Sequence, residues 1–264
     1  MQLLPCHKTL LALMSGVFVS LSAFASDTAH VHEEQAGKTW TDPASGIEFV
    51  YVPHGCFEMG SAKGEESEVP VHQVCFAKGY WLSRYEITQS QYQSVMGSNP
   101  SKFKGEQNPV DSVSWNDTQA FLAKLNAETH EHFALPTESE WEYACKAGGQ
   151  HPLYCGMGGA ESLAWGLDNA QDATHPVGEK FSNHWGLYDM SGNVQEWVAD
   201  CYSSTYEWAP GDGSARDWEG CGMRVLRGGS WQYDGHYLRS TARYYSPLDS
   251  KADDVGFRVM RSAH

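Results

Sequence analysis

The sequence predicts a mixed α+β domain in which short strands and a few helices are joined by much ordered loop. Strand-like apolar runs come first, within residues 47–60 and 71–76. Helix start signals follow, and all of them fall between residues 88 and 148. After Gly148 the apolar periodicity fades into a stretch rich in Gly, Trp, Tyr and Asp. Helices in one part of a chain and short strands in the rest are typical of the α+β class.

The first 25 residues have the pattern of a secretory signal peptide. Lys8 precedes an apolar run from Leu10 to Leu21, and a small-residue cleavage site follows at residues 23–25. We therefore expect cleavage before Ser26 and a mature protein that is periplasmic or secreted. Residues 26–41 are polar and lack an apolar period, which predicts a flexible leader before one domain at residues 42–264.

The formal net charge of −15 argues against nucleic acid and anionic membrane surfaces as partners. It suits solubility and the binding of divalent cations. No later stretch approaches the roughly 20 apolar residues of a membrane helix, so we expect no membrane insertion. No feature of the sequence indicates an oligomeric state.

Short strands are predicted on both sides of the helical region. Residues 47–60 (IEFVYVPHGCFEMG) are expected to form two strands that turn at residues 53–55, and VHQVCF at residues 71–76 is expected to form a third. The acidic segment between them, GEESEV at residues 64–69, is predicted to be an exposed loop. Later apolar runs that can form strands are MRVLRGGSW and VGFRVM.

Three capping signals predict three helices. In each signal, a Ser or Thr is followed three residues later by a side chain that can return the hydrogen bond: Thr88 with Gln91, Ser114 with Asp117, and Thr137 with Glu140. Such pairs satisfy backbone N–H groups that the first helical turn leaves without partners. The helices that we expect are QSQYQSVM, ending at Gly97, TQAFLAKLNAET, and WEYACKA, ending at Gly148.

An even number of cysteines follows the signal segment: Cys56, Cys75, Cys145, Cys155, Cys201 and Cys221. In an exported chain this number indicates disulfides. Other connectivities are open, but loop closure is easiest between neighbours, which favours the pairs 56–75, 145–155 and 201–221. A metal–thiolate site is the alternative, and the absence of any C-x-x-C spacing argues against it.

An ordered series of motifs runs through the chain: FVYVPHGCFEMGS, HQVCFAKGYWLSRYEITQSQY, NPVDSVSWNDTQAFLAKLN, LPTESEWEYACKAGG, WGLYDMSGNVQEWVADCY, RVLRGGSW, LRSTAR and VGFRVMRS. In this order they resemble the sulfatase-modifying-factor family, which includes formylglycine-generating enzyme and the pyoverdine chromophore-maturation protein. The resemblance extends from about Gly46 to Arg261. It implies a loop-rich α+β fold similar to the C-type-lectin-like fold. Fold alone does not imply function.

The chain departs from the family at the residues that carry formylglycine chemistry. The resemblance implies that two cysteines after the GGS motif hold copper, and thiolates suit Cu(I) because both are soft. The matching positions here are Tyr233 and Leu238, and no cysteine follows Cys221. The usual aromatic of the GNVWEW motif is replaced by Gln195. We therefore place this chain in the branch that lacks the cysteine pair, like the pyoverdine-maturation relative, and expect no formylglycine-generating activity.

Other features of the family's active-site groove remain. Ser230 matches a serine that lines it, and aromatic residues crowd the same segment. The candidate groove residues are Ser230, Trp231, Tyr233, His236 and Gln195. Aromatic rings with a few polar groups suit a peptide or small-molecule ligand. Arg239, Arg243 and Arg258 are expected instead to pin loops to carboxylates through bidentate pairs.

The segment DMSGNVQE (residues 189–196) matches a calcium-binding loop of the family. Carried over by position, the resemblance implies carboxylate ligands from Asp189 and Glu196 and backbone carbonyl ligands from Gly192 and Val194. Calcium takes six to eight oxygen ligands, so this mixture is chemically suitable for a structural ion. No redox metal is indicated.

Two functions remain open at this level. The first is an exported oxidative maturation factor that acts on a peptide-derived substrate without the copper dithiolate site. The second is a non-catalytic binding or display module, in which the lectin-like fold presents residues 231–249 to a ligand. Tyr and Ser in that segment give contact area with little loss of entropy, which suits the second function as well.

Overall fold

The strands of this protein form three separate sheets in the computed structural model, which describes residues 1–2, 35–151 and 153–262. The largest sheet has the strand order β1, β2, β5, β11, β6. Its strands are β1 (Thr39–Thr41), β2 (Glu48–Val52), β5 (Tyr80–Ser83), β11 (Met260–Ser262) and β6 (Phe133–Ala134). It joins the beginning of the domain to its end, and the described residues from Gln35 onward form one compact unit.

The second sheet has the order β10, β7, β8, β9, and a third consists of β3 and β4. Their bounds are β10 (Val255–Phe257), β7 (Gln195–Cys201), β8 (Met223–Arg227), β9 (Arg243–Pro247), β3 (Gly55–Met59) and β4 (His72–Phe76). β7 pairs with β10 in parallel and with β8 in antiparallel fashion, and β9 is antiparallel to β8. β9 is therefore an edge strand of its sheet.

The helices begin at the predicted capping residues. Helices α2 (Gln89–Met96), α3 (Trp115–Thr129) and α4 (Glu138–Cys145) each follow a cap whose side chain accepts from the third residue of the helix. All three capping boxes are closed by the returning bond. Helices α3 and α4 start earlier than expected, because the residue after the cap is already helical. A single turn, α5 (Ala160–Leu163), lies in the half where no helix was predicted.

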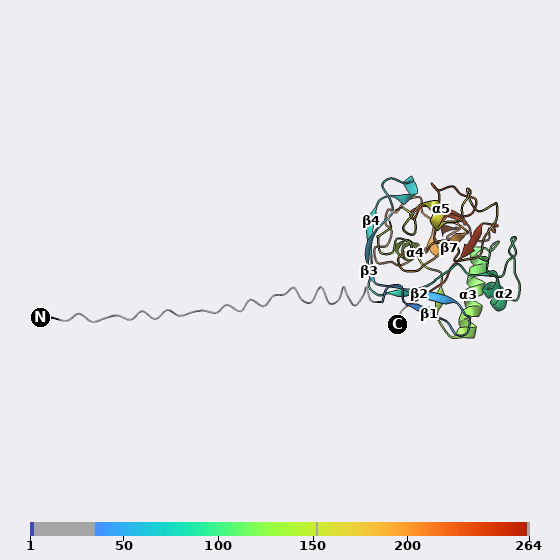
Figure 1. Cartoon of the computed structure of the whole chain (residues 1–264), viewed down its shortest axis with the longest axis horizontal. Helices are drawn as coiled ribbons and strands as arrows, with labels where there is room; N and C mark the ends of the chain where they lie inside the picture. Colours follow the sequence, from blue (N-terminus) through green and yellow to red (C-terminus); the bar gives the residue numbers. More distant parts are fainter. Residues whose placement is uncertain (3–34, 152, 263–264) are drawn as a thin grey trace. The chain divides into compact units, whose positions relative to one another are not determined.

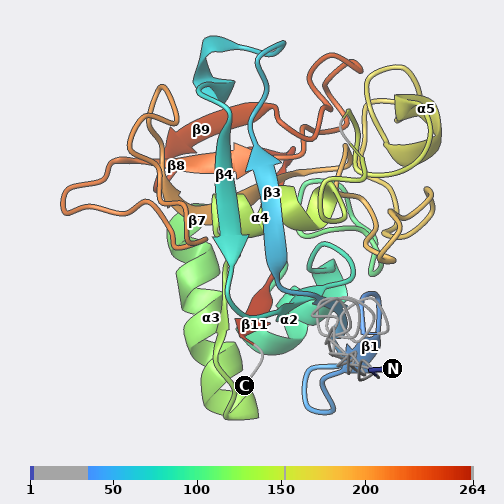
Figure 2. The same cartoon turned by 90° about the vertical axis from the view of Figure 1, so that its left-hand side faces the viewer.

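Helix α4 is packed between two sheets. It contacts β3 on one side and β7 and β8 on the other, while α2 and α3 lie side by side elsewhere on the domain (Figures 1 and 2). Trp141 on α4 and Trp197 on β7 are among the largest fully buried side chains. Helix α4 thereby anchors the sheet whose loops carry the candidate site residues.

The two strands predicted at residues 47–60 exist, but they do not pair with each other. β2 belongs to the five-stranded sheet, where it pairs with β1 and β5, whereas β3 pairs with β4. Val50 and Val52 are fully buried in the five-stranded sheet, and Phe57 is buried in the two-stranded sheet of β3 and β4. The turn at residues 53–55 therefore carries the chain between two sheets, which the alternation of apolar residues alone does not reveal.

Two boundaries in the first part of the chain differ from expectation. β1 lies inside the segment 26–41 that was expected to be a flexible leader, and its Trp40 ring packs on Phe49 at 5.2 Å between centroids. The ordered domain thus begins before residue 42. The acidic segment at residues 64–69 contains a short 3₁₀ turn, η1 (Glu66–Glu68), and Glu68 is fully buried against Arg239. It is therefore not wholly an exposed loop.

No helix of the described residues is long and apolar enough to cross a bilayer. The predicted signal peptide falls almost entirely in residues 3–34, which lie outside the described residues.

Candidate functional site

Three segments bring polar side chains to the same end of the four-stranded sheet. Gln195 is the first residue of β7, Asp254 directly precedes β10, and Ser230 lies in the loop after β8. Because β7 and β10 are parallel and β8 runs against them, the starts of β7 and β10 and the end of β8 coincide. The strand pattern therefore places these three side chains together.

The three side chains form one hydrogen-bonded unit. Gln195 Nε2 donates to Asp254 Oδ2 across 3.0 Å, and Ser230 Oγ donates to the same oxygen across 2.9 Å. A carboxylate oxygen accepts hydrogen bonds, so the amide nitrogen of Gln195 must face Asp254 and its Oε1 must point elsewhere. Oε1 is buried and has no hydrogen-bond partner within the described part of the chain. An acceptor without a donor in such a place indicates a missing ligand or water.

Tyrosine rings lie beside this unit. The Tyr233 and Tyr244 rings are tilted against each other with centroids 5.0 Å apart, and Tyr245 stacks on Tyr202 with centroids 3.9 Å apart. Tyr244 donates its hydroxyl to the carbonyl of Tyr237 across 2.6 Å, which holds its ring in place. The surface next to Asp254 is therefore a set of fixed aromatic faces.

Gln195, Asp254 and three of the tyrosines line a pocket of about 410 Å³, which we call the Asp254 groove, whereas Ser230 is fully buried and does not line it. Its lining residues include Gln195, Leu226, Tyr233, Tyr244, Tyr245 and Asp254. Tyrosine rings and a few apolar side chains are combined there with polar groups, and the polar part of the lining surface is the larger. Fixed polar groups beside aromatic rings can orient a small ligand.

The phenols of the groove stay protonated at neutral pH. Burial raises the pKa of Tyr233, and the nearby Asp254 charge raises it further, while the Gln195 amide opposes the shift. Burial also raises the pKa of Tyr244, with Tyr233 as the next cause. Neither group is therefore a base, and Tyr233 can donate a hydrogen bond to a ligand, whereas the hydroxyl proton of Tyr244 is already donated to the Tyr237 carbonyl.

The positions that match the family's two cysteines lie together in a neighbouring pocket. Tyr233 and Leu238 both line a pocket of about 310 Å³ beside helix α5, and Tyr233 is shared with the Asp254 groove. Neither side chain offers a soft ligand. All six cysteines of the described residues are held in disulfides, so none of them supplies a thiolate for Cu(I).

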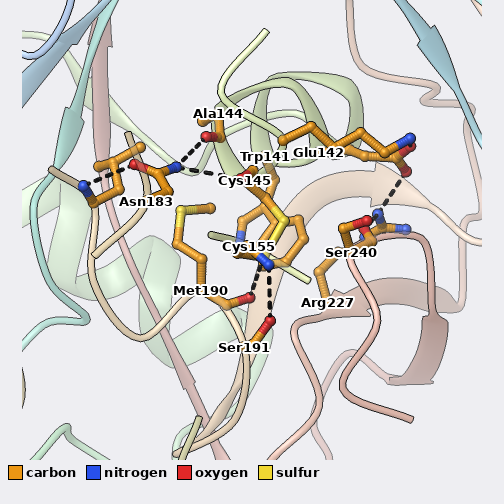
Figure 3. Close-up of a disulfide and its surroundings, with 12 residues drawn as sticks. Trp141, Glu142, Ala144, Cys145, Cys155, Asn183, Met190, Ser191, Arg227 and Ser240 are labelled. Atoms are coloured by element: carbon orange, nitrogen blue, oxygen red, sulfur yellow. Dashed lines mark hydrogen bonds and ion pairs between the residues drawn. A yellow bond between two sulfur atoms is a disulfide. The ribbon is translucent and has the colours of Figure 1, made fainter. Parts of the chain in front are cut away.

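The disulfides join the neighbours that loop closure favoured: Cys56–Cys75, Cys145–Cys155 and Cys201–Cys221. Figure 3 shows the second of these beside Trp141 and Met190. It ties the end of α4 to a loop whose backbone, at Cys155 N, donates to Ser191 Oγ across 3.3 Å. The DMSGNVQE segment is thus hydrogen-bonded to a loop that a disulfide joins to α4.

Within the described residues, one group of three His, Cys, Asp or Glu side chains has its ligand atoms close enough to share a metal ion: Cys201, Asp217 and Cys221. Two of its members form the third disulfide. It is therefore not a thiolate site in this oxidation state.

The predicted calcium ligands do not fit the ion as a set. Both carboxylate oxygens of Glu196 accept from Arg258, at 2.7 and 2.8 Å, and Oε2 also accepts from the Trp141 indole at 2.7 Å. A calcium ion at Glu196 would have to displace or face a guanidinium. Asp189 is buried and accepts from the backbone of Gly178 across 2.7 Å. Gly192 and Val194 lie between them in the same loop, with Val194 N donating to Glu86.

Three of the predicted groove residues do not line the Asp254 groove: Ser230, which is fully buried and hydrogen-bonded to Asp254, Trp231 and His236. His236 has a side chain that is 56% exposed, and its Nε2 faces Glu65 Oε1 at 3.3 Å. Trp231 is buried, with its indole N–H donating to the Asp253 carbonyl and its ring edge against Phe103. Trp231 thus packs the loop from behind, and His236 faces solvent. The predicted residues that do meet are Gln195, Ser230 and Tyr233.

Asp254 is the functional candidate that sequence reasoning missed. Its two side-chain partners are 59 and 24 residues away in the chain, so no local motif marks it. The one available signal was its position directly before the VGFRVM strand. The expected arginine pairs, in contrast, are confirmed: Arg239 with Glu68, Arg243 with Glu138 and Arg258 with Glu196, each bidentate.

Curated relatives match most of the length of this chain. It is 26% identical over 268 residues to the chaperone protein LppX of Paenibacillus barcinonensis, covering 81% of this chain and 89% of that protein. It is 30% identical over 218 residues to the formylglycine-generating enzyme of Mus musculus, covering 74% of this chain. That match spans 54% of the mouse enzyme, about half its length.

A solved structure of high similarity is that of PvdO from Pseudomonas aeruginosa. It superposes with a TM-score of 0.79 at 31% identity and covers 86% of this chain and 99% of that one. The C-type-lectin-like α+β fold expected from the motifs is therefore confirmed. The model of the sulfatase-modifying factor enzyme 1-like domain matches residues 35–263, which is nearly everything after the predicted signal and leader. The chain belongs to this sulfatase-modifying-factor family.

Proposed function

We propose that this protein is an exported oxidative maturation factor that acts on a peptide-derived substrate bound in the Asp254 groove. The observation that carries the proposal is the groove itself: a buried Gln195–Asp254–Ser230 unit under a set of tyrosine rings, in a family member without a copper dithiolate. Similarity to PvdO, which also lies within the family, supports the same branch.

The residues of the groove are suited to binding a substrate and handling its protons. Asp254 offers a carboxylate oxygen, Oδ1, to which no described residue donates, since Gln195 and Ser230 both use Oδ2. Tyr233 keeps its proton, because burial raises its pKa, and can donate to a substrate heteroatom. Removal of two hydrogens from a substrate releases two protons, which this carboxylate can relay, and two electrons, which an external acceptor such as dioxygen takes.

Export is part of the proposal. Three disulfides within the described residues suit an oxidising compartment, and the predicted signal peptide supplies the route to it. We assign no redox metal. Calcium stays a prediction from the resemblance, for which Glu196 is not a suitable ligand while Arg258 holds it.

The test is a comparison of exported compounds from a deletion strain of the source organism and from the same strain carrying variants. We expect a peptide-derived compound two hydrogens heavier to accumulate in the deletion strain and in the Asp254→Asn and Tyr233→Phe strains. The chain itself and Asp253→Asn, which removes the same charge from the adjacent residue, should restore the lighter form. Mass spectrometry of the secreted and periplasmic fractions measures both.

Identical compounds in all strains would contradict a maturation role. In that case a ligand that binds the groove unchanged would support the alternative, a non-catalytic binding module.

A further inference from the structure

The carboxylate of Asp254 lies in the groove without a cationic partner. The residue is 6% exposed, and its known partners, Gln195 and Ser230, are neutral. No Lys, Arg or His of the described residues forms an ion pair with it. A buried carboxylate loses hydration, and neutral hydrogen bonds restore only part of what water supplies.

Cations near Asp254 are committed elsewhere. Arg243 lines the groove, but its Nε and Nη2 donate to the two oxygens of Glu138, at 2.6 and 2.8 Å. Lys102 pairs with Asp253, the residue next to Asp254, and Lys251 pairs with Asp117 across 2.6 Å. The negative charge in the groove is therefore left for a ligand.

The rest of the lining suits a cation as well. Tyr233, Tyr244 and Tyr245 line the pocket, and the face of an aromatic ring attracts an ammonium or guanidinium group. The amide of Gln195 adds a fixed acceptor, Oε1, because its nitrogen is held by Asp254. A guanidinium or ammonium carries several N–H donors and no acceptor, which matches a carboxylate and an amide that line the same pocket.

We propose that the Asp254 groove recognises a cationic side chain, guanidinium or ammonium, of its peptide ligand. That the ligand is a peptide rests on the proposed function. The preference for a cation follows independently from Asp254, Gln195 and the tyrosines. The family's usual aromatic at position 195 would lack the acceptor, since an indole has only a donor. The glutamine at this position therefore makes the groove of this chain selective for a donor-rich cation.

The first experiment compares two peptides of the same shape. The probes are acetyl-Gly-Gly-Arg-Gly-Gly-amide and the same peptide with citrulline, which replaces the guanidinium by a neutral urea. Calorimetric titration of the mature protein at near-physiological ionic strength should show binding of the arginine peptide about tenfold tighter or more, the effect of one charge-assisted hydrogen bond. Equal affinity, or binding of neither peptide, overturns the inference.

Matched variants separate local recognition from the overall negative charge of the protein. Asp254→Asn should reduce the preference for arginine over citrulline to about twofold or less, whereas Asp253→Asn should keep it, although both remove one charge. Melting curves of both variants confirm that they are folded. Loss of the preference in Asp253→Asn to the same extent would show a diffuse field effect and overturn the assignment to Asp254.

Failure of the cation site can be distinguished from failure of the proposed maturation role. A strong arginine preference without any change in exported compounds would support the cation site and contradict maturation. Conversely, a matured compound that carries no cationic group would support the maturation role and contradict the cation site.

Discussion

Glu196 and Arg258 form a bidentate ion pair in the interior of the domain, with Nε to Oε2 at 2.7 Å and Nη2 to Oε1 at 2.8 Å. Both side chains are fully buried. Arg258 also donates to the carbonyls of Ser83 and Tyr188, across 3.0 and 2.8 Å. One guanidinium therefore connects β7, the loop between β10 and β11, the end of β5 and the DMSGNVQE segment.

Replacement of Arg258 should be strongly destabilising. Arg258→Gln leaves the buried Glu196 carboxylate without its cation, so we expect the free energy of unfolding to fall by about 3–5 kcal/mol. Urea unfolding followed by tryptophan fluorescence measures the change. The control is Arg84→Gln, which breaks a partly exposed pair with Glu48 and should cost about 0–1 kcal/mol. Similar losses in the two variants would contradict this reading of the pair.

The Glu196–Arg258 pair also affects whether the protein can bind calcium at Glu196. Because Arg258 occupies both oxygens of Glu196, we expect calcium and chelator to give the same melting temperature for the mature protein, although the family resemblance predicts stabilisation. Metal analysis of the purified protein shows whether an ion is held too tightly to exchange. A rise in melting temperature with calcium that disappears in Asp189→Ala would restore the predicted ligand set.

Formylglycine generation should be absent. The positions of the two copper ligands carry Tyr233 and Leu238, and the described cysteines are all in disulfides. Copper-loaded protein should therefore not convert the cysteine of a sulfatase-motif peptide, as followed by the mass of the peptide. A cysteine-containing family member is the positive control. Turnover above that of free copper would contradict the assignment.

Restoring the cysteines tests whether the metal ligands suffice. Tyr233 and Leu238 line the same pocket, so Tyr233→Cys combined with Leu238→Cys should create a Cu(I) site, measurable by competition with a chromogenic chelator. We expect little formylglycine activity in that variant. Gln195 and Asp254 remain, and catalysis requires the whole arrangement around the metal.

Asp200 should make stability fall as pH rises. Burial, with the charge of Glu138 as the next cause, raises its pKa from 3.8 to about 7. Between about pH 4 and pH 7 the unfolded chain releases this proton while the folded protein keeps it, so the contribution of Asp200 is full below pH 4 and lost by pH 7. The limit is on the order of 4 kcal/mol.

The measurement is urea unfolding of the unchanged protein and of Asp200→Asn across that range. The difference between them should move in favour of the variant as pH rises, even if the lost acceptor for the backbone N–H of Glu138 or Arg216 destabilises it at low pH. A difference that does not vary with pH would contradict the raised pKa.

Local signals in the sequence determined the helices and several strands. The capping boxes at Thr88, Ser114 and Thr137 predicted where α2, α3 and α4 begin, because a cap and its partner are three residues apart. Neighbour pairing of the cysteines was predictable for the same reason, since short loops close most easily. The motif series predicted the fold and the family, and the missing cysteines after Cys221 predicted the absence of a dithiolate.

Only the tertiary structure decided which distant groups meet. Sequence reasoning expected Arg239, Arg243 and Arg258 to pair with carboxylates, but Glu68, Glu138 and Glu196 became identifiable as partners through the fold. Asp254 gained its role because parallel pairing of β7 and β10 places it beside Gln195, 59 residues away. Hydrogen bonds and ion pairs act over a few ångströms, so a residue's chemistry follows its neighbours in space, and one-dimensional patterns identify those neighbours only within a turn or two of chain.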